Sequence, residues 1–101
     1  MEFITAEELR KRKDEFMILD IRDASNFSRR HIGGSINIDV YGSIHEGDYE
    51  TVREKLSKLP KDKTIITVCN AGVTAQPASL ILESIGYKTK VLEDGMIGWK
   101  Y

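Results

Sequence analysis

The chain has 101 residues, of which 41% are hydrophobic and 31% charged, so it has the composition of a folded protein and the length of a single domain over residues 1–101. Its 15 Lys and Arg against 16 Asp and Glu give a formal net charge of −1, which argues against nucleic acid or an anionic membrane as a partner, because both demand a surplus of basic residues. One cysteine excludes an internal disulfide, and together with two histidines it is too few for a metal cluster, so we expect neither a metal nor a cofactor.

The N-terminal segment contains the first predicted helix. Residues 5–8 (TAEE) form a capping box, in which the Thr5 hydroxyl accepts from the backbone N–H of Glu8 and the Glu8 carboxylate reaches back to the Thr5 N–H. We expect this helix to end at about Lys13. Acidic residues stand where a signal peptide would have its apolar region, and no stretch is apolar enough to cross a bilayer. The sequence therefore favours a cytoplasmic protein without a membrane partner.

Short strands and helices then alternate along the chain. We expect strands at residues 16–20 (FMILD), 35–39 (SINID), 64–69 (TIITVC) and 88–92 (KTKVL), and helical segments at residues 23–28, 48–59, 75–85 and 95–99. Asp23 and Asp48 would cap the first two of these helices, and Pro60 would stop the second. Strands separated by helices form parallel βα units, so the predicted fold class is α/β. We expect three layers, with a mostly parallel central sheet of about five strands and helices on both faces.

The single cysteine, Cys69, ends the clearest of these strands, and the residues that follow it are Asn70, Ala71, Gly72, Val73 and Thr74. In open α/β sheets, ligands bind beyond the carboxyl ends of the strands. The first N–H groups of the next helix point into the same space and favour an anion there, including a thiolate, which makes Cys69 a candidate nucleophile. The alternative is a small buried hydrophobic residue at a strand end. Position alone leaves both interpretations open.

Four motifs together resemble the rhodanese (sulfurtransferase) family. They are residues 18–23 (ILDIRD), residues 31–38 (HIGGSINI), residues 69–75 (CNAGVTA) and residues 86–99 (GYKTKVLEDGMIGW). They stand in the order that the family shows, with Asp94 in place of the first glycine of the closing motif. The resemblance implies the rhodanese-like form of the three-layer α/β fold.

The resemblance also implies sulfur transfer with Cys69 as the persulfide carrier. The Cys69 thiolate would attack the outer sulfur of a donor such as thiosulfate, and sulfite would leave. A thiophilic acceptor, which is cyanide in an assay or a thiol or a protein in a cell, would then take the sulfur. Loop residues 70–74 would bind the substrate, and their amides would stabilise its negative charge.

The loop lacks the cations that many family members carry. Thr74 stands where many of them have arginine, and Asn70 and Ala71 stand where some have arginine and lysine. No charged residue occurs at positions 64–82. Backbone amides and hydroxyls, or a cation from elsewhere, would have to hold the donor anion.

The nearest candidates for that cation are Arg29 and Arg30. The substrate-contacting arginine that the family carries near its first motif falls here on Asn26. A phosphatase or arsenate reductase loop of the Cys-x5-Arg type needs arginine at position 75 to clamp a tetrahedral oxyanion, and this position is alanine. The sequence therefore argues against both of those activities.

Asp20 and Arg22 are candidates for a supporting role. A carboxylate and a guanidinium at the end of a buried strand more often form an ion pair that holds the fold than a catalytic pair. The resemblance implies that Asp20 lies close to the active-site loop. Two alternatives to a sulfurtransferase stay open. One is a catalytically quiet module with a binding or regulatory role, and the other is a one-cysteine oxidant sensor with an exposed thiolate.

Overall fold

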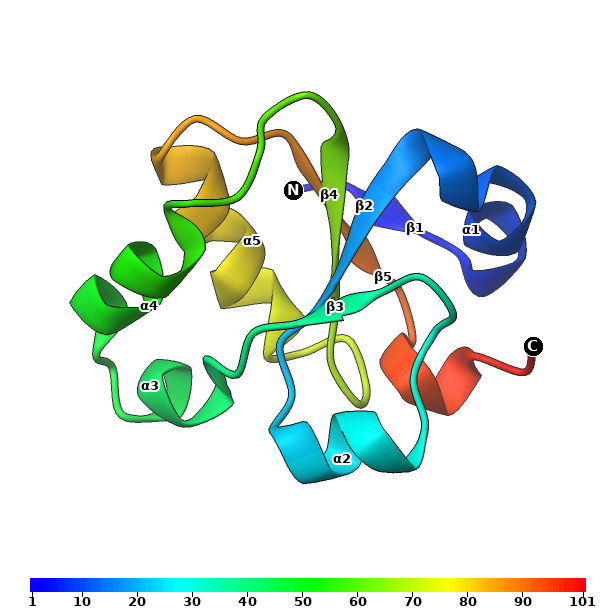
Figure 1. Cartoon of the computed structure of the whole chain (residues 1–101), viewed down its shortest axis with the longest axis horizontal. Coiled ribbons are helices and arrows are strands. Elements are labelled where there is room, and N and C mark those ends of the chain that lie inside the picture. Colours follow the sequence, from blue (N-terminus) through cyan, green and yellow to red (C-terminus); the bar gives the residue numbers. More distant parts are fainter.

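A five-stranded parallel sheet forms the middle of the computed structural model, which describes residues 1–101 (Figure 1). The strands are β1 (Phe3–Ile4), β2 (Phe16–Asp20), β3 (Ile36–Asn37), β4 (Thr64–Val68) and β5 (Thr89–Leu92). The helices are α1 (Ala6–Arg12), α2 (Ala24–Arg29), α3 (Tyr41–His45), α4 (Tyr49–Leu56) and α5 (Ala75–Ser84), with short 3-10 turns η1 (Lys13–Glu15) and η2 (Gly95–Gly98). The strand order is β1-β5-β4-β2-β3. This architecture confirms the predicted α/β class.

Each face of the sheet has its own hydrophobic core, because successive side chains of a strand point to opposite faces. On β4, Ile65 belongs to the core that lies under α3, α4 and α5, and Cys69 continues the same face. Ile66 and Val68 belong to the other core, with Leu9 of α1 and the C-terminal Trp99. Figure 1 shows the two groups of helices on either side of the sheet. Coverage of both faces explains why β4 has no charged residue and no exposed position, with Ile65, Ile66, Thr67 and Val68 all buried.

Most of the predicted elements form where the sequence places them, with shorter ends. Thr5 Oγ1 accepts from the Glu8 N–H at 3.1 Å, as predicted, but the Glu8 carboxylate pairs with Arg12 and does not reach back to Thr5. The arginine one turn later offers that carboxylate an ion pair, which is a stronger interaction than a bond to an amide. The helix expected over residues 48–59 ends at Leu56, and the strand expected over residues 35–39 consists of two residues.

Strand β1 and helix α3 lie outside the sequence predictions. A two-residue strand and a five-residue helix without a side-chain cap leave no periodicity to detect. None of the helices in the structure has the length and apolarity needed to cross a membrane.

Candidate active site

Cys69 directly follows β4 at the carboxyl end of the sheet, where the chain turns through residues 70–74 into α5. Figure 1 shows this yellow-green loop between α3, α2 and the red turn η2. The side chain of Cys69 is 2% exposed. In the loop, Asn70, Ala71 and Val73 are exposed, whereas Gly72 and Thr74 are buried. The predicted loop residues therefore surround the sulfur with backbone, and the Val73 side chain points to solvent.

Two backbone N–H groups donate to the sulfur of Cys69. The Gly72 N–H lies 3.2 Å from Sγ, and the Ala75 N–H, at the start of α5, lies 3.3 Å from it. The Gln76 side chain donates to the Gly72 carbonyl at 2.9 Å and so holds the loop on its helix. Fixed N–H donors stabilise negative charge without having to reorganise when it forms. The geometry therefore suits an anionic sulfur at this position.

The turn η2 holds the loop from behind. The Met96 N–H donates to the Cys69 carbonyl and the Ile97 N–H to the Asn70 carbonyl, both at 2.9 Å. Gly95 permits this contact, because its φ is +57° and a Cβ there would lie 2.5 Å from the Cys69 carbonyl oxygen. The glycine of the C-terminal motif thus serves the cysteine loop, which lies 26 positions earlier in the chain.

Gly72 fits tightly against β5, and this close fit makes a testable prediction. Its φ is +83°, and a Cβ there would lie 2.3 Å from the backbone oxygen of Glu93. Gly72→Ala therefore combines backbone strain with a clash. We expect it to lower the free energy of unfolding by about 1–3 kcal/mol more than Gly34→Ala does, measured by urea denaturation. Gly34 is the matched control, since its φ is +86° and a Cβ there meets nothing within 4 Å. Equal losses in the two variants would contradict a tightly held loop.

Asp20 and Arg22 form a buried ion pair that connects to η2. Arg22 Nε lies 2.9 Å from Asp20 Oδ1, and Nη2 lies 2.7 Å from Oδ2. The same Nη2 donates to the Arg30 carbonyl at 2.7 Å. Arg30 in turn donates to the carbonyls of Met96, at 3.0 Å, and Trp99. A chain of hydrogen bonds thus runs from Asp20 through Arg22 and Arg30 to η2, the turn that holds the cysteine loop. Through these bonds the predicted supporting pair can help to fix the position of the loop.

A pocket of about 260 Å³ adjoins the loop at Asn70. Its other lining residues are Arg22, Asn26, Arg29, Arg30, Met96 and Ile97. Every charged side chain in this lining is an arginine. Arg22 is neutralised by Asp20, and Arg30 is held by two carbonyls. Arg29 donates to the Asn26 side chain and forms no ion pair, although its charge helps to lower the pKa of Asp23; it contributes a positive charge to the pocket.

Helix α2 carries Asn26 and Arg29, and Asp23 caps it as predicted. The Asp23 carboxylate accepts from the Asn26 N–H at 2.8 Å and from the Ser25 hydroxyl at 3.1 Å. The hydrogen bond from the Asn26 backbone, and then that from Ser25, hold the pKa of Asp23 below its ordinary value. The cap therefore stays ionised at neutral pH and fixes the helix that forms one wall of the pocket.

Sequence reasoning missed one residue that contacts the loop. His45, on α3, has its Nε2 atom 3.3 Å from the Thr74 hydroxyl oxygen, and its ring lies against Tyr41. No local signal in the sequence indicates this contact, because the two residues are 29 positions apart and α3 itself was not predicted. His31, in contrast, contacts the Phe27 carbonyl at 2.7 Å through Nδ1 and stacks on the Phe27 ring.

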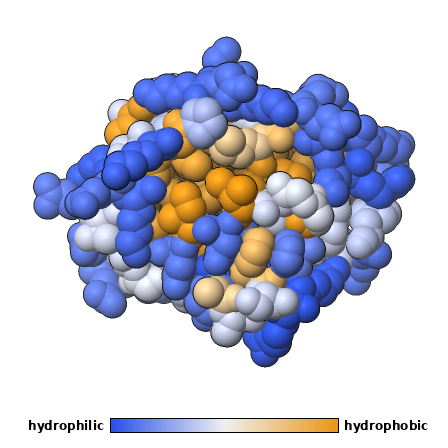
Figure 2. Space-filling view, viewed as in Figure 1, coloured by the Kyte–Doolittle hydropathy of each residue, from blue (hydrophilic) through white to orange (hydrophobic).

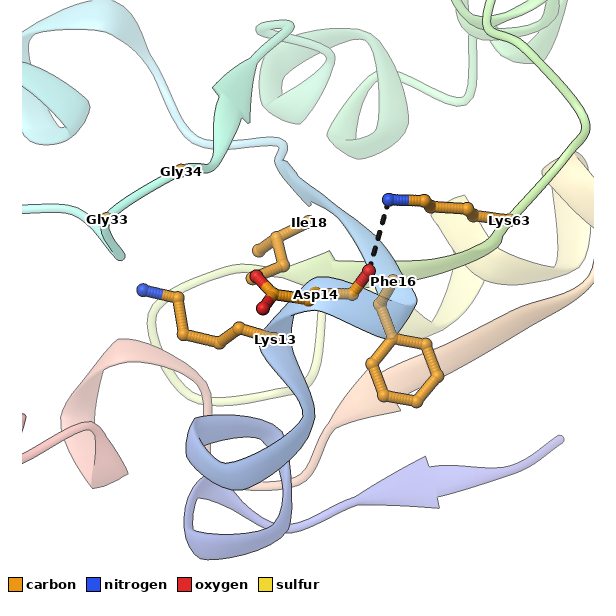
Figure 3. A pocket seen from close by; sticks show the side chains of 7 residues that line it. All are labelled: Lys13, Asp14, Phe16, Ile18, Gly33, Gly34 and Lys63. Carbon is orange, nitrogen blue, oxygen red and sulfur yellow. Dashed lines mark hydrogen bonds between the residues drawn. The ribbon is translucent and has the colours of Figure 1, made fainter.

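A second pocket lies at the end of the sheet opposite to the cysteine loop. Figure 2, in the view of Figure 1, shows apolar side chains in the middle of the visible surface, framed by hydrophilic ones. Strand β3 pairs only with Leu19 and Asp20 of β2, so the first residues of β2 have no neighbouring strand on that edge. A pocket of about 450 Å³ lies there, lined by Lys13, Asp14, Phe16, Ile18, Lys63 and two glycines (Figure 3). Lys63 Nζ donates to the Asp14 carbonyl across it at 3.1 Å. None of the residues that line this pocket belongs to the cysteine loop.

Comparisons with known proteins agree with this architecture. A family model described as the rhodanese-like domain matches residues 5–101. The chain is 30% identical, over 96% of its length, to an HTH-type transcriptional regulator of Mycobacterium tuberculosis, of which it covers 41%. It is 26% identical, over 83% of its length, to thiosulfate sulfurtransferase GlpE of Tolumonas auensis, of which it covers 72%. The crystal structure of a rhodanese-related protein from Thermoplasma volcanium superposes with a TM-score of 0.82 at 25% identity, over 98% of this chain and 90% of that one. The chain thus spans about two fifths of the regulator and most of the other two proteins.

Proposed function

Because the chain belongs to the rhodanese-like domain family, we propose that it is a sulfurtransferase that carries sulfane sulfur as a persulfide on Cys69. Its membership of the family confirms the resemblance that the sequence motifs showed, and the rhodanese-like fold with it. A relative named for thiosulfate sulfur transfer supports thiosulfate as the donor. The observation that carries the proposal is the pair of N–H groups, from Gly72 and Ala75, that donate to the Cys69 sulfur.

The proposed reaction has two steps. In the first, the Cys69 thiolate attacks the outer sulfur of thiosulfate, the S–S bond of the donor breaks, and sulfite leaves with the electron pair. The product is an anionic persulfide on Cys69. In the second, an acceptor such as cyanide or a thiolate attacks the outer sulfur, and Cys69 leaves as the thiolate. The negative charge stays on sulfur throughout, so fixed backbone donors can stabilise every state.

Intact-mass measurement after incubation with thiosulfate tests the proposal. We expect the protein to gain one sulfur atom and to lose it again when cyanide is added, with thiocyanate formed in equal amount. Peptide mapping should place the sulfur on Cys69. A protein that gains no sulfur from thiosulfate, polysulfide or mercaptopyruvate would rule out the proposed function.

We place the anionic end of the donor in the pocket beside Asn70. Arg29 contributes a positive charge there without a carboxylate partner, whereas the Arg30 guanidinium is occupied by the carbonyls of Met96 and Trp99. Of the two arginines that the sequence suggested, Arg29 is therefore the better candidate for binding the sulfonate oxygens of thiosulfate. A guanidinium suits such oxygens because its N–H groups form a planar fork.

Replacement of Arg29 tests this placement. We expect Arg29→Ala to raise the KM for thiosulfate about tenfold with little change in kcat, since one charge-assisted hydrogen bond to the substrate is lost. Steady-state thiocyanate formation measures both constants. Arg53→Ala is the matched control, because Arg53 is an exposed arginine on α4 that does not line the pocket. An unchanged KM in Arg29→Ala would place the donor elsewhere.

A second candidate function is a catalytically quiet module with a binding or regulatory role. The observation that favours it is the burial of Cys69, whose side chain is 2% exposed. A regulator among the relatives points the same way. The oxidant sensor considered from the sequence requires an exposed thiolate, and the burial of Cys69 argues against it. Absence of sulfur uptake in the mass experiment would favour the quiet module.

We propose that residues 1–101 act as one domain, and that the acceptor is a thiol or a protein that carries one, with no nucleic acid or membrane as partner. A cysteine that must alternate between thiolate and persulfide is suited to the reducing cytoplasm.

A further inference from the structure

We infer that His45, in its protonated form, supplies a second positive charge, at the Thr74 end of the cysteine loop, and that it thereby favours an anionic sulfur donor. This inference rests on the proposed function. It adds a specificity-determining residue that none of the sequence motifs includes, on a helix that the sequence did not predict.

His45 contacts the cysteine loop at Thr74. Nε2 of His45 lies 3.3 Å from Oγ1 of Thr74. Thr74 is 9% exposed and directly precedes Ala75, whose N–H donates to the cysteine sulfur. His45 is the one ionisable side chain from outside the loop that hydrogen-bonds a residue of loop 69–74, and no Asp, Glu, Lys or Arg occurs at positions 64–82. The charge state of His45 therefore sets the side-chain charge at the Thr74 end of the loop, whereas Arg29 lies in the pocket beside Asn70.

Protonation of His45 also changes what the Thr74 hydroxyl can do. An imidazolium carries a proton on both nitrogens, so Nε2 can only donate, and Thr74 Oγ1 must accept. The hydroxyl proton of Thr74 is then free to donate to an anion at the loop. When the ring is neutral with its proton on Nδ1, Nε2 accepts that hydroxyl proton instead. One proton on His45 thus adds a positive charge and makes a further hydrogen-bond donor available.

The surroundings of His45 leave its charge available to the loop. The ring packs on Tyr41 of its own helix, with ring centroids 4.3 Å apart. The other titratable groups at the end of α3 and on α4, which packs against it, are Glu46, Asp48, Tyr49, Glu50, Arg53, Glu54 and Lys55. None of them forms an ion pair with His45. Asp48, the acidic cap of α4, accepts from the Thr51 hydroxyl and N–H, and these bonds hold its pKa below the ordinary value.

The test compares an anionic with a neutral reagent at the same sulfur. The rate of persulfide formation with thiosulfate is measured by intact mass for the native protein and for His45→Gln, at several pH values between about pH 6 and pH 8. Glutamine keeps an N–H donor for Thr74 and loses the charge. Alkylation of Cys69 by neutral iodoacetamide is measured in parallel. The iodoacetamide rates report any difference in the reactivity of the Cys69 sulfur itself between the two proteins.

We expect the ratio of native to variant rates with thiosulfate to rise as the pH falls, reaching about three- to tenfold at the acidic end, which is the size of a partly screened interaction between a cation and a dianion. The ratio for iodoacetamide should stay near one. His31→Gln is the matched control and should match the native protein with both reagents, since His31 contacts Phe27 and not the loop.

Two results would overturn the inference alone. One is a thiosulfate ratio that stays near one at every pH while the persulfide forms. The other is an equal change with thiosulfate and iodoacetamide, which would show that His45 acts on the thiolate or on the fold and not on the donor anion. A native protein that takes up no sulfur from any donor but reacts with iodoacetamide would instead overturn the proposed function, and the inference with it.

Discussion

Replacement of Cys69 by serine is expected to abolish sulfur uptake from thiosulfate and thiocyanate formation completely. Cys69 is the only cysteine in the chain, so no second thiol can substitute for it. A serine hydroxyl is not ionised near neutral pH and cannot carry a sulfane sulfur. Intact mass after thiosulfate treatment, together with steady-state thiocyanate formation, measures the loss. Sulfur uptake by Cys69→Ser would show that another group carries the sulfur.

The fold of Cys69→Ser should change little, which makes the loss of activity interpretable. Serine is close to cysteine in size, and the N–H groups of Gly72 and Ala75 that reach the sulfur can donate to its oxygen instead. A buried hydroxyl with hydrogen-bond partners avoids most of the cost of burial, so we expect a stability loss of no more than about 1 kcal/mol in urea denaturation. Cys69→Ala gives a second inactive variant without a buried hydroxyl.

Asp20→Asn is expected to be the most destabilising of the conservative substitutions, with a loss of about 3–5 kcal/mol in the free energy of unfolding. The side chains of Asp20 and Arg22 are 1% and 6% exposed, so the variant leaves a guanidinium buried without a carboxylate. Arg22 also donates to the Arg30 carbonyl, and Arg30 holds η2 against the cysteine loop. Urea denaturation of the native protein and the variant measures the difference.

Glu7→Gln is the matched control for this substitution. It makes the same change from carboxylate to amide in the Lys11–Glu7 pair, whose side chains are 61% and 67% exposed. An exposed pair one helical turn apart contributes little, so we expect a loss of no more than about 0.5 kcal/mol. If Asp20→Asn is no more destabilising than Glu7→Gln, the buried pair does not hold the fold in the way that its geometry indicates.

Local patterns in the sequence were sufficient to predict most of the secondary structure. The apolar runs of β2 and β4, the caps at Thr5, Asp23 and Asp48, and the helix after the loop are encoded by neighbouring residues. The alternation of strands and helices then predicted a parallel sheet, because parallel strands are joined by crossover connections that usually contain a helix. The position of Cys69 at the carboxyl end of the sheet follows from the same reasoning. Strand β1 and helix α3 were not predicted, because no longer alternating run surrounds β1 and no side-chain cap marks the start of α3.

The contacts that shape the site depend on residues far apart in the chain. Arg30 lies 66 positions from Met96, and His45 lies 29 positions from Thr74. The sequence could suggest Arg29 and Arg30 equally as cations, and only their hydrogen bonds separate a structural arginine from one that is available to an anion.

The sequence by itself thus determined the family, the parallel α/β architecture and the single cysteine as the centre of the site. Only the tertiary structure decided that two N–H groups reach the sulfur, that η2 supports the loop, and that His45 contacts it. The physical reason is that hydrophobic period, caps and turns act over a few neighbouring residues. Which helix ends meet at the mouth of the sheet depends on how those elements pack around the two cores.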